Sequence, residues 1–153
     1  MKTFAIVNQK GGVAKTTTTF NLATALAAQG HNVLMVDLDP QASLTISTGI
    51  FPESYGNDNI CRLFQRKNKT ANYAMRVDST AEATGDRLYL IPSDINLAAT
   101  EMDIFAKTSR EKLLKKALKQ VEDHFDYCFI DCPPNLGMFT INALTAADEV
   151  IVP

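Results

Sequence analysis

The chain alternates short apolar runs with segments of helical pattern, and this alternation constrains the fold more than any other feature. The apolar runs cover residues 3–7, 32–36, 88–91, 127–130 and 149–152. They show little polar alternation, which is typical of parallel strands that are buried on both faces. The first two runs and the helical segment 16–29 predict a βαβ unit with a right-handed crossover. We therefore predict an α/β fold of three layers, with a mostly parallel central sheet and helices on both faces.

The remaining helical segments follow the same alternation. Apolar residues at helical spacing predict helices over residues 41–49, 96–105, 110–124 and 136–147. Asp58 and Asn59 are alternative caps for a short helix that runs through Phe64. The run at 149–152 predicts a strand buried on both faces, and such a strand needs a following helix to cover it. We therefore expect residues 1–153 to form a single domain that is truncated at its C-terminal end.

Composition excludes several classes of protein. The chain has 153 residues, of which 46% are hydrophobic and 21% are charged, so it can bury a core without a metal or a disulfide. The net charge of −2 gives no overall attraction to nucleic acid or to an anionic membrane. Residues 1–76 carry 8 basic and 4 acidic side chains, whereas residues 77–153 carry 7 and 13, so we expect any site for a polyanion in the first half. No apolar run reaches the roughly 18 residues that a bilayer requires.

The three cysteines, Cys61, Cys128 and Cys132, do not have the spacing of a zinc site. On one extended strand Cys128 and Cys132 would lie on the same face about 13 Å apart, at ~3.3 Å per residue. A disulfide needs Cα atoms within about 7 Å of each other. We therefore expect reduced thiols and a cytoplasmic protein.

A glycine-rich segment between the first strand and the first helix has the chemistry of a phosphate-binding loop. It reads Gln9-Lys10-Gly11-Gly12-Val13-Ala14-Lys15-Thr16-Thr17. Glycines let backbone N–H groups surround an anion, and the helix N-terminus adds partial positive charge. Lys15 adds a full charge, and the Thr16 hydroxyl is suited to bind Mg²⁺. Ala14 stands where the strict motif has glycine, and we predict that its backbone is right-handed.

Two acidic segments follow predicted strands at the edge where open parallel sheets bind ligands. Asp131 closes the apolar run 127–130, and we expect it to act on Mg²⁺ through water, since Mg²⁺ keeps several waters. Asp37 and Asp39 follow the second strand and should share one face, because side chains alternate along a strand.

These motifs resemble those of a known family. The segment KGGVAKTT resembles the deviant Walker A motif, KGGxGK[ST], of the ParA/MinD family of ATPases, whose mark is a lysine at the position of Lys10. Asp37-Leu38-Asp39-Pro40-Gln41 resembles the first switch region of that family. Phe129-Ile130-Asp131-Cys132-Pro133-Pro134 resembles its Walker B strand and second switch. The Asp-x-Asp-Pro-Gln form and the ending 149–153 are more similar to the ParA (Soj-like) branch than to MinD.

The resemblance implies a P-loop NTPase fold, with residues 1–153 as a single nucleotide-binding domain and with ATP and Mg²⁺ as ligands. It assigns phosphate binding to Lys10, Gly11, Gly12, Val13, Ala14, Lys15, Thr16 and Thr17. It assigns catalysis to Lys10, Lys15 and Asp39, with Asp39 on the attacking water and Lys10 reaching the phosphates of a partner subunit. It assigns Mg²⁺ to Thr16, Asp37 and Asp131, with Asp37 in a supporting role. The implied switch residues are Asp39, Pro40, Gln41, Pro133 and Pro134.

The implied function is partitioning of plasmid or chromosomal DNA by ATP-dependent dimerisation and slow hydrolysis. The implied partners are a second copy of the chain, a ParB-like centromere-binding protein and non-specific DNA, with no membrane. Arg66, Lys67 and Lys69 could contact DNA phosphates, although a short charged run is more typical of a solvated loop.

Other functions remain open at this point. A MinD-like membrane-cycling ATPase of the cell-division site would need an amphipathic C-terminal helix that the sequence lacks. A nucleotide-binding switch without efficient turnover would result if Ala14 disturbs the phosphate geometry. An iron–sulfur carrier is disfavoured because two of the cysteines lie in the Walker B segment. A dinucleotide dehydrogenase is disfavoured because no G-x-G-x-x-G follows the first strand.

Overall fold

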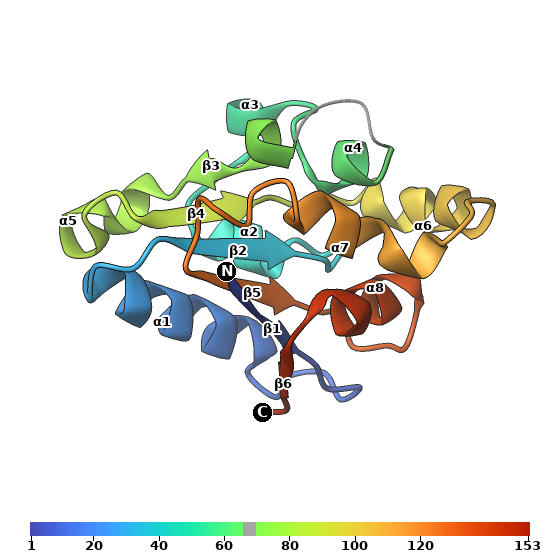
Figure 1. Ribbon diagram of the computed structural model, residues 1–153, viewed down its shortest axis with the longest axis horizontal. Coiled ribbons are helices and arrows are strands. Elements are labelled where there is room, and N and C mark those ends of the chain that lie inside the picture. The colour runs from blue at the N-terminus through green and yellow to red at the C-terminus, as the bar shows by residue number, and fades with distance from the viewer. Residues whose placement is uncertain (66–69) are drawn as a thin grey trace.

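A central sheet forms the middle layer of the molecule (Figure 1). The computed structural model describes residues 1–65 and 70–153. Within them, the sheet has six strands in the order β3-β4-β2-β5-β1-β6, and only β3 is antiparallel to its neighbour. The strands are β1 (Lys2–Ile6), β2 (Val33–Asp37), β3 (Met75–Arg76), β4 (Leu88–Ile91), β5 (Tyr127–Asp131) and β6 (Glu149–Ile151). The mostly parallel sheet predicted from the apolar runs is confirmed.

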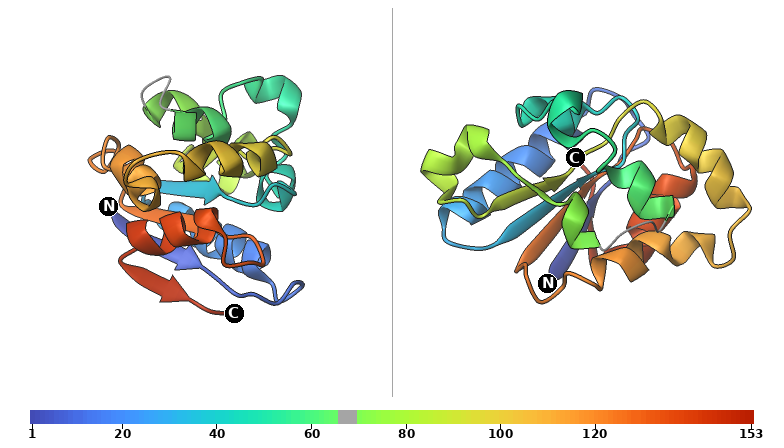
Figure 2. Two further views of the ribbon diagram at one scale, coloured as in Figure 1. Left: turned by 90° about the vertical axis from the view of Figure 1, so that its right-hand side faces the viewer. Right: turned by 90° about the horizontal axis from the view of Figure 1, so that it is seen from above.

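Helices cover both faces of this sheet, as the right-hand view of Figure 2 shows. One face carries α1 (Lys15–Ala28), α2 (Ser43–Ser47), α3 (Pro52–Tyr55) and α5 (Ala81–Thr84). The other face carries α4 (Ile60–Gln65), α6 (Leu97–Phe105), α7 (Leu113–Leu118) and α8 (Met138–Ala146). Short 3₁₀ helices span Thr70–Tyr73, Asp78–Thr80 and Arg110–Lys112. The predicted three-layer α/β fold is therefore confirmed.

Strand β2 shows why its sequence lacks polar alternation. Every residue of β2 is buried. Val33 and Met35 pack into the core beneath α1, whereas Leu34 and Val36 pack into the core beneath α4, α6, α7 and α8. Both faces of the strand therefore need apolar side chains.

The register of the parallel strands gathers the acidic residues at one edge. Asp131 at the end of β5 pairs with Ile6 of β1 on one side and with Asp37 of β2 on the other. The loop that joins β1 to α1 leaves the sheet at the same edge. This edge is where ligands bind in open parallel sheets.

Several predicted element bounds need correction. The helix predicted over 110–124 is a 3₁₀ turn followed by α7, which ends at Leu118, and the residues after it form turns. The strand predicted to be buried on both faces is β6, which lies at the sheet edge with Glu149 and Val150 exposed. Among the described strands β6 pairs with β1 alone. An uncovered strand at this point is what we expect of a truncated domain, and the truncation itself stays a prediction. Asn59 is confirmed as a cap, because its Oδ1 accepts hydrogen bonds from the N–H groups of residues 61 and 62.

The cysteines are buried and free, as expected. Cys128 and Cys132 lie in the same core cluster, which confirms that they share one face. Burial raises the pKa of the Cys61 thiol to about 11 and raises the pKa of both other thiols. The three thiols therefore remain protonated at neutral pH and are poor nucleophiles.

Arg66, Lys67 and Lys69 lie outside the described residues. Among the helices described, none combines the length and the apolar character that crossing a membrane requires.

Candidate functional site

The loop between β1 and α1 brings backbone donors to the start of a helix. Helix α1 begins at Lys15, and no side chain caps its N-terminus. The first N–H groups of a helix have no partner within the helix, and they carry the positive end of the helix dipole. Gly12, with φ of 70°, lets the loop turn in a left-handed conformation. The loop therefore has the form of an anion site, as the sequence predicted.

The prediction for Ala14 is wrong. Ala14 has φ of 64° and ψ of 26°, which is left-handed and not right-handed. The Cβ atom of an L-residue meets the following carbonyl oxygen in this region, at a cost of roughly 1–2 kcal/mol. The glycine that the strict motif has at this position was the signal for a positive φ.

A pocket of about 480 Å³ lies against this loop. Its walls come from three parts of the chain that the sequence analysis had linked, namely the phosphate loop and the two switch regions. The lining residues are Gly11, Gly12, Val13, Ala14, Lys15, Thr16, Thr17, Asp39, Ser43 and Pro134. Most of the predicted phosphate-binding residues thus share one cavity with Asp39 and Pro134.

The two lysines of the loop differ in their surroundings. Lys15 is only 8% exposed, and its Nζ donates a hydrogen bond of 3.2 Å to the Lys10 carbonyl oxygen. Lys10 is exposed, and it is not among the residues that line the pocket. Lys15 is therefore placed to act within its own subunit. The Lys10 side chain is free to face outward, as its predicted role in a partner's site requires.

Asp131 and Thr16 form the part of the site that fits a divalent cation. The Thr16 hydroxyl donates a hydrogen bond of 2.7 Å to Oδ2 of Asp131. Oδ1 of Asp131 is buried and has no hydrogen-bond partner among the described residues. Burial, with a smaller effect from Asp39, raises the pKa of Asp131 to about 6, while Thr16 and Lys15 oppose the shift. A buried, unpartnered carboxylate oxygen beside a hydroxyl suits Mg²⁺, which prefers oxygen ligands.

Protein side chains alone provide few ligands here. Within the residues that the structure describes, no group of three or more His, Cys, Asp or Glu side chains could hold a metal ion. Mg²⁺ commonly takes one or two protein ligands and completes its shell with water and substrate phosphates. The donor set at Asp131 and Thr16 therefore fits a cation that binds together with a nucleotide.

Asp37 is fully buried, and both of its carboxylate oxygens are used within the protein. Oδ1 accepts a hydrogen bond from the Asp39 N–H, and Oδ2 accepts hydrogen bonds from the N–H and the hydroxyl of Thr45. Burial and the nearby charge of Asp131 raise the pKa of Asp37 to about 7, although these hydrogen bonds oppose the shift. Asp37 thus fixes the start of the first switch region. Its predicted supporting role at the metal remains a prediction.

Asp39 is half-buried and faces the pocket. Its Oδ1 accepts a hydrogen bond from the Gln41 N–H, and its carbonyl oxygen accepts one from the Ser93 hydroxyl. The Ser93 N–H donates in turn to the hydroxyl of Thr45. Sequence reasoning missed Thr45 and Ser93. Ser93 lies two residues after the end of β4, at the ligand-binding edge of the sheet, and that position was the one available signal.

The predicted switch residues occupy different settings. Pro133 is buried, whereas Pro134 is exposed and lines the phosphate pocket. Pro40 is half-buried, and Gln41 is exposed. Both segments thus begin at a buried aspartate, Asp37 or Asp131, and reach the surface within a few residues.

Comparison with known proteins agrees with this geometry. A family model described as an AAA domain, AAA_31, matches residues 1–153. The chain belongs to the AAA_31 family. The sporulation initiation inhibitor protein Soj of Bacillus subtilis is 43% identical to it over 152 residues, which cover 99% of this chain and 57% of that protein. The chain therefore spans little more than half the length of this relative.

Solved structures of relatives share the fold of this AAA_31 domain. A cobyrinic acid a,c-diamide synthase from Mycobacterium smegmatis, with bound ATP analogue and magnesium, matches with a TM-score of 0.91 and 40% identity over 100% of this chain and 59% of its own. A plasmid partition protein from Borrelia burgdorferi, bound to AMPPNP, matches with a TM-score of 0.86 and 31% identity over 99% of this chain and 60% of its own. The P-loop NTPase fold and the resemblance to ParA- and Soj-like ATPases are confirmed.

Proposed function

We propose that this AAA_31 domain binds ATP together with Mg²⁺ and hydrolyses it, as part of a ParA-like partitioning ATPase. The observation that carries the proposal is the buried Oδ1 of Asp131, which has no partner among the described residues and lies on a carboxylate that Thr16 binds. Thr16 is the second residue of α1, so the Asp131 carboxylate lies beside the same loop that offers N–H donors to phosphate. Solved relatives with a bound ATP analogue, ADP or magnesium support the choice of ligands.

The residues divide the reaction between binding and chemistry. The N–H groups of residues 11–17 and the ammonium of Lys15 hold the phosphates. Thr16 and Asp131 would hold Mg²⁺, which would neutralise charge on the phosphate oxygens. Asp39 orients a water molecule that attacks the γ-phosphorus. The bond to the bridging oxygen breaks, one proton of the water passes to a phosphate oxygen, and ADP and phosphate leave. Lys10 of a second copy adds positive charge to the transition state.

Partitioning of plasmid or chromosomal DNA is the biological role that the relatives support. Their names include a chromosome-partitioning ATPase Soj of Treponema pallidum and a chromosome partitioning protein ParA of Caulobacter vibrioides. The role requires an ATP-dependent homodimer in the cytoplasm, a ParB-like partner and non-specific DNA. These relatives favour the ParA branch over the MinD-like alternative.

Two variants test the assignment of binding and turnover to separate residues. Lys15→Ala should abolish detectable binding of Mg-ATP in calorimetry, whereas Lys116→Ala, an exposed lysine of α7, should bind as the parent does. Asp39→Ala should bind Mg-ATP normally and release little phosphate. Unchanged ATP affinity in Lys15→Ala would refute the proposed site.

Phosphate release by the parent chain separates the remaining alternatives. Release that rises on addition of DNA and a ParB-like protein supports the partitioning role. Tight ATP binding with no release under any condition would instead support a switch without efficient turnover. A second candidate is an ATP-using synthase, which the similarity to the cobyrinic acid a,c-diamide synthase favours. In that case phosphate release should depend on a carboxylic acid acceptor and not on DNA.

A further inference from the structure

The start of α8 is held by a residue from another helix. Gly137 precedes α8 and has no side chain that could cap it. The N–H of Met138, the first residue of α8, instead donates a hydrogen bond of 2.7 Å to Oε1 of Glu101 in α6. A carboxylate is favourable at this end of a helix, because it accepts a charge-assisted hydrogen bond and complements the helix dipole.

Gly137 leaves the space that this carboxylate occupies. A Cβ atom at residue 137 would lie 2.5 Å from Oε1 of Glu101 and 2.9 Å from Oδ1 of Asn135. The backbone of Gly137 is extended, with φ of −73° and ψ of −175°, and any residue can adopt that conformation. Glycine is therefore needed here for the close approach of Glu101 and not for an unusual turn.

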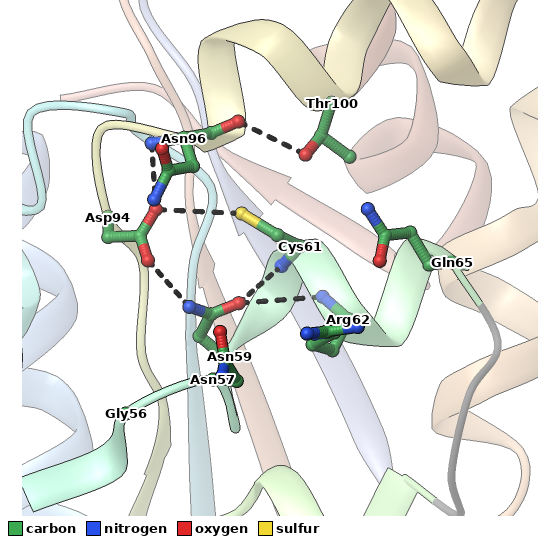
Figure 3. Close-up of a pocket in the computed structure, with 9 residues that line it drawn as sticks. All are labelled: Gly56, Asn57, Asn59, Cys61, Arg62, Gln65, Asp94, Asn96 and Thr100. Atoms are coloured by element: carbon green, nitrogen blue, oxygen red, sulfur yellow. Dashed lines mark hydrogen bonds between the residues drawn. The ribbon is translucent and has the colours of Figure 1, made fainter.

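Helix α6 gives Glu101 a rigid base. Leu97, Thr100 and Ile104 of α6 are buried. The segment that leads into α6 is tied to α4 by Asp94, which accepts hydrogen bonds from the side chains of Asn59 and Cys61 (Figure 3). A group on a helix that is fixed in this way can position its partner more accurately than a group on a loop.

We propose that Glu101 is a positioning residue for the second-switch loop, residues 133–137. This inference rests on the proposed function. Thr16 holds the loop at its start through Asp131, and Glu101 holds its end through Met138. Between these fixed ends, Pro134 lines the phosphate pocket. Glu101 therefore sets where the loop stands against the γ-phosphate, although its own carboxylate is directed at α8.

Internal hydrogen bonds make the loop a short, stiff connection. Oδ1 of Asn135 accepts a hydrogen bond from the Gly137 N–H, and the Asn135 carbonyl oxygen accepts one from the Thr140 hydroxyl. Movement at Pro134 is thus transmitted to the start of α8, where Glu101 resists it. Loss of Glu101 should disturb turnover more than it disturbs the binding of ADP, which has no γ-phosphate.

Kinetics of three variants in the full chain test this role. Glu101→Ala should lower kcat for ATP hydrolysis about tenfold, the effect of losing one charge-assisted hydrogen bond, with less than about a twofold change in the Kd of ADP. Glu101→Gln keeps an acceptor oxygen and should retain most of the kcat. Asp103→Ala, an exposed carboxylate on the same helix, should match the parent. Equal losses of kcat and ADP affinity in Glu101→Ala, or no rescue by Glu101→Gln, would overturn the proposal.

Amide hydrogen exchange tests the proposal independently of turnover. Glu101→Ala should speed exchange at the Met138 amide about tenfold, and Glu101→Gln should not. Gly137→Ala should also speed exchange at the Met138 amide in the parent. In the Glu101→Ala background it should speed exchange less, because the carboxylate that the new Cβ would meet is absent. Fully additive effects would overturn the proposal. If the parent fails to hydrolyse ATP, the proposed function fails, and exchange at Met138 still decides whether Glu101 positions the loop.

Discussion

Ala14 gives a direct test of the phosphate loop, because a left-handed backbone penalises alanine and not glycine. Ala14 has φ of 64° just before α1. A Cβ atom in that region costs roughly 1–2 kcal/mol. We therefore predict that Ala14→Gly raises the free energy of unfolding of the ligand-free chain.

Two opposing contributions set the size of this effect. Relief of the strain contributes about 1–2 kcal/mol, and the greater freedom of glycine in the unfolded chain removes about 0.4–1 kcal/mol. The net gain is about 0.5–1 kcal/mol, which raises Tm by about 1–4 °C in a chain of this length. The strain is present in the ligand-free loop and is therefore common to the free and bound states. Nucleotide affinity should consequently change less than about threefold, or ~0.7 kcal/mol.

Chemical denaturation followed by circular dichroism measures the stability, and calorimetry measures the affinity. Gly11 and Gly12 provide matched controls, because a Cβ atom added at either would meet nothing within 4 Å, and only Gly12 of the two has a positive φ. With both contributions counted, Gly12→Ala should destabilise the chain by about 0.5–1 kcal/mol, whereas Gly11→Ala should stabilise it by about 0.4–1 kcal/mol. No gain in Ala14→Gly, together with equal effects at the two glycines, would refute the left-handed assignment.

Three further predictions concern the acidic residues of the site. Burial raises the pKa of Asp131 from 3.8 to about 6. Between these pH values the folded chain binds more protons at Asp131 than the unfolded chain does, so the free energy of unfolding falls as the pH rises. Asp131→Asn should therefore gain stability over the parent between about pH 4 and pH 6, as denaturation at several pH values would show, and it should lose the stabilisation that Mg-ATP gives. In a chain extended beyond Pro153, Asp39→Ala should accumulate as an ATP-bound dimer in light scattering, and a persistent monomer would contradict this. Thr45→Val removes one of the three hydrogen bonds that Asp37 accepts and leaves the Ser93 N–H without its partner, and it should cost about 1–3 kcal/mol of unfolding free energy in urea titrations.

The central strands and α1 were predictable because their sequence signals are strong and local. Strand β2 is apolar on both faces, and a strand of that kind fits only between two layers of helices. The region 70–86 gave no such signal, since it forms two short 3₁₀ helices, a two-residue strand and α5, none of which spans enough residues to show a period. The overlong helix predicted over 110–124 arose because Val121, in the turns after Leu118, is buried and continues the helical spacing of apolar residues.

Site residues could be predicted from the sequence where their role depends on residue type. They could not be predicted where their role depends on contacts between segments that are distant in the sequence. Lys15, Thr16 and Asp131 were identified from their places next to strands, and the structure brings them together. The bond from Glu101 to Met138 joins residues 37 positions apart, and neither residue is unusual in its own segment. Only the packing of α6 against α8 makes that contact visible.

The strained and costly features of the molecule gather at one edge of the sheet. Ala14 adopts a conformation that alanine disfavours, and burial raises the pKa values of both Asp37 and Asp131. Each feature lowers the stability of the ligand-free chain, and natural proteins retain such conflicts where function requires them. A bound cation would favour the ionised form of Asp131 and so offset the cost of burying its charge. The loop, the buried carboxylates and the proposed Mg-ATP site are therefore linked through stability, and Mg-ATP should stabilise the parent more above pH 6, where Asp131 ionises, than at pH 5.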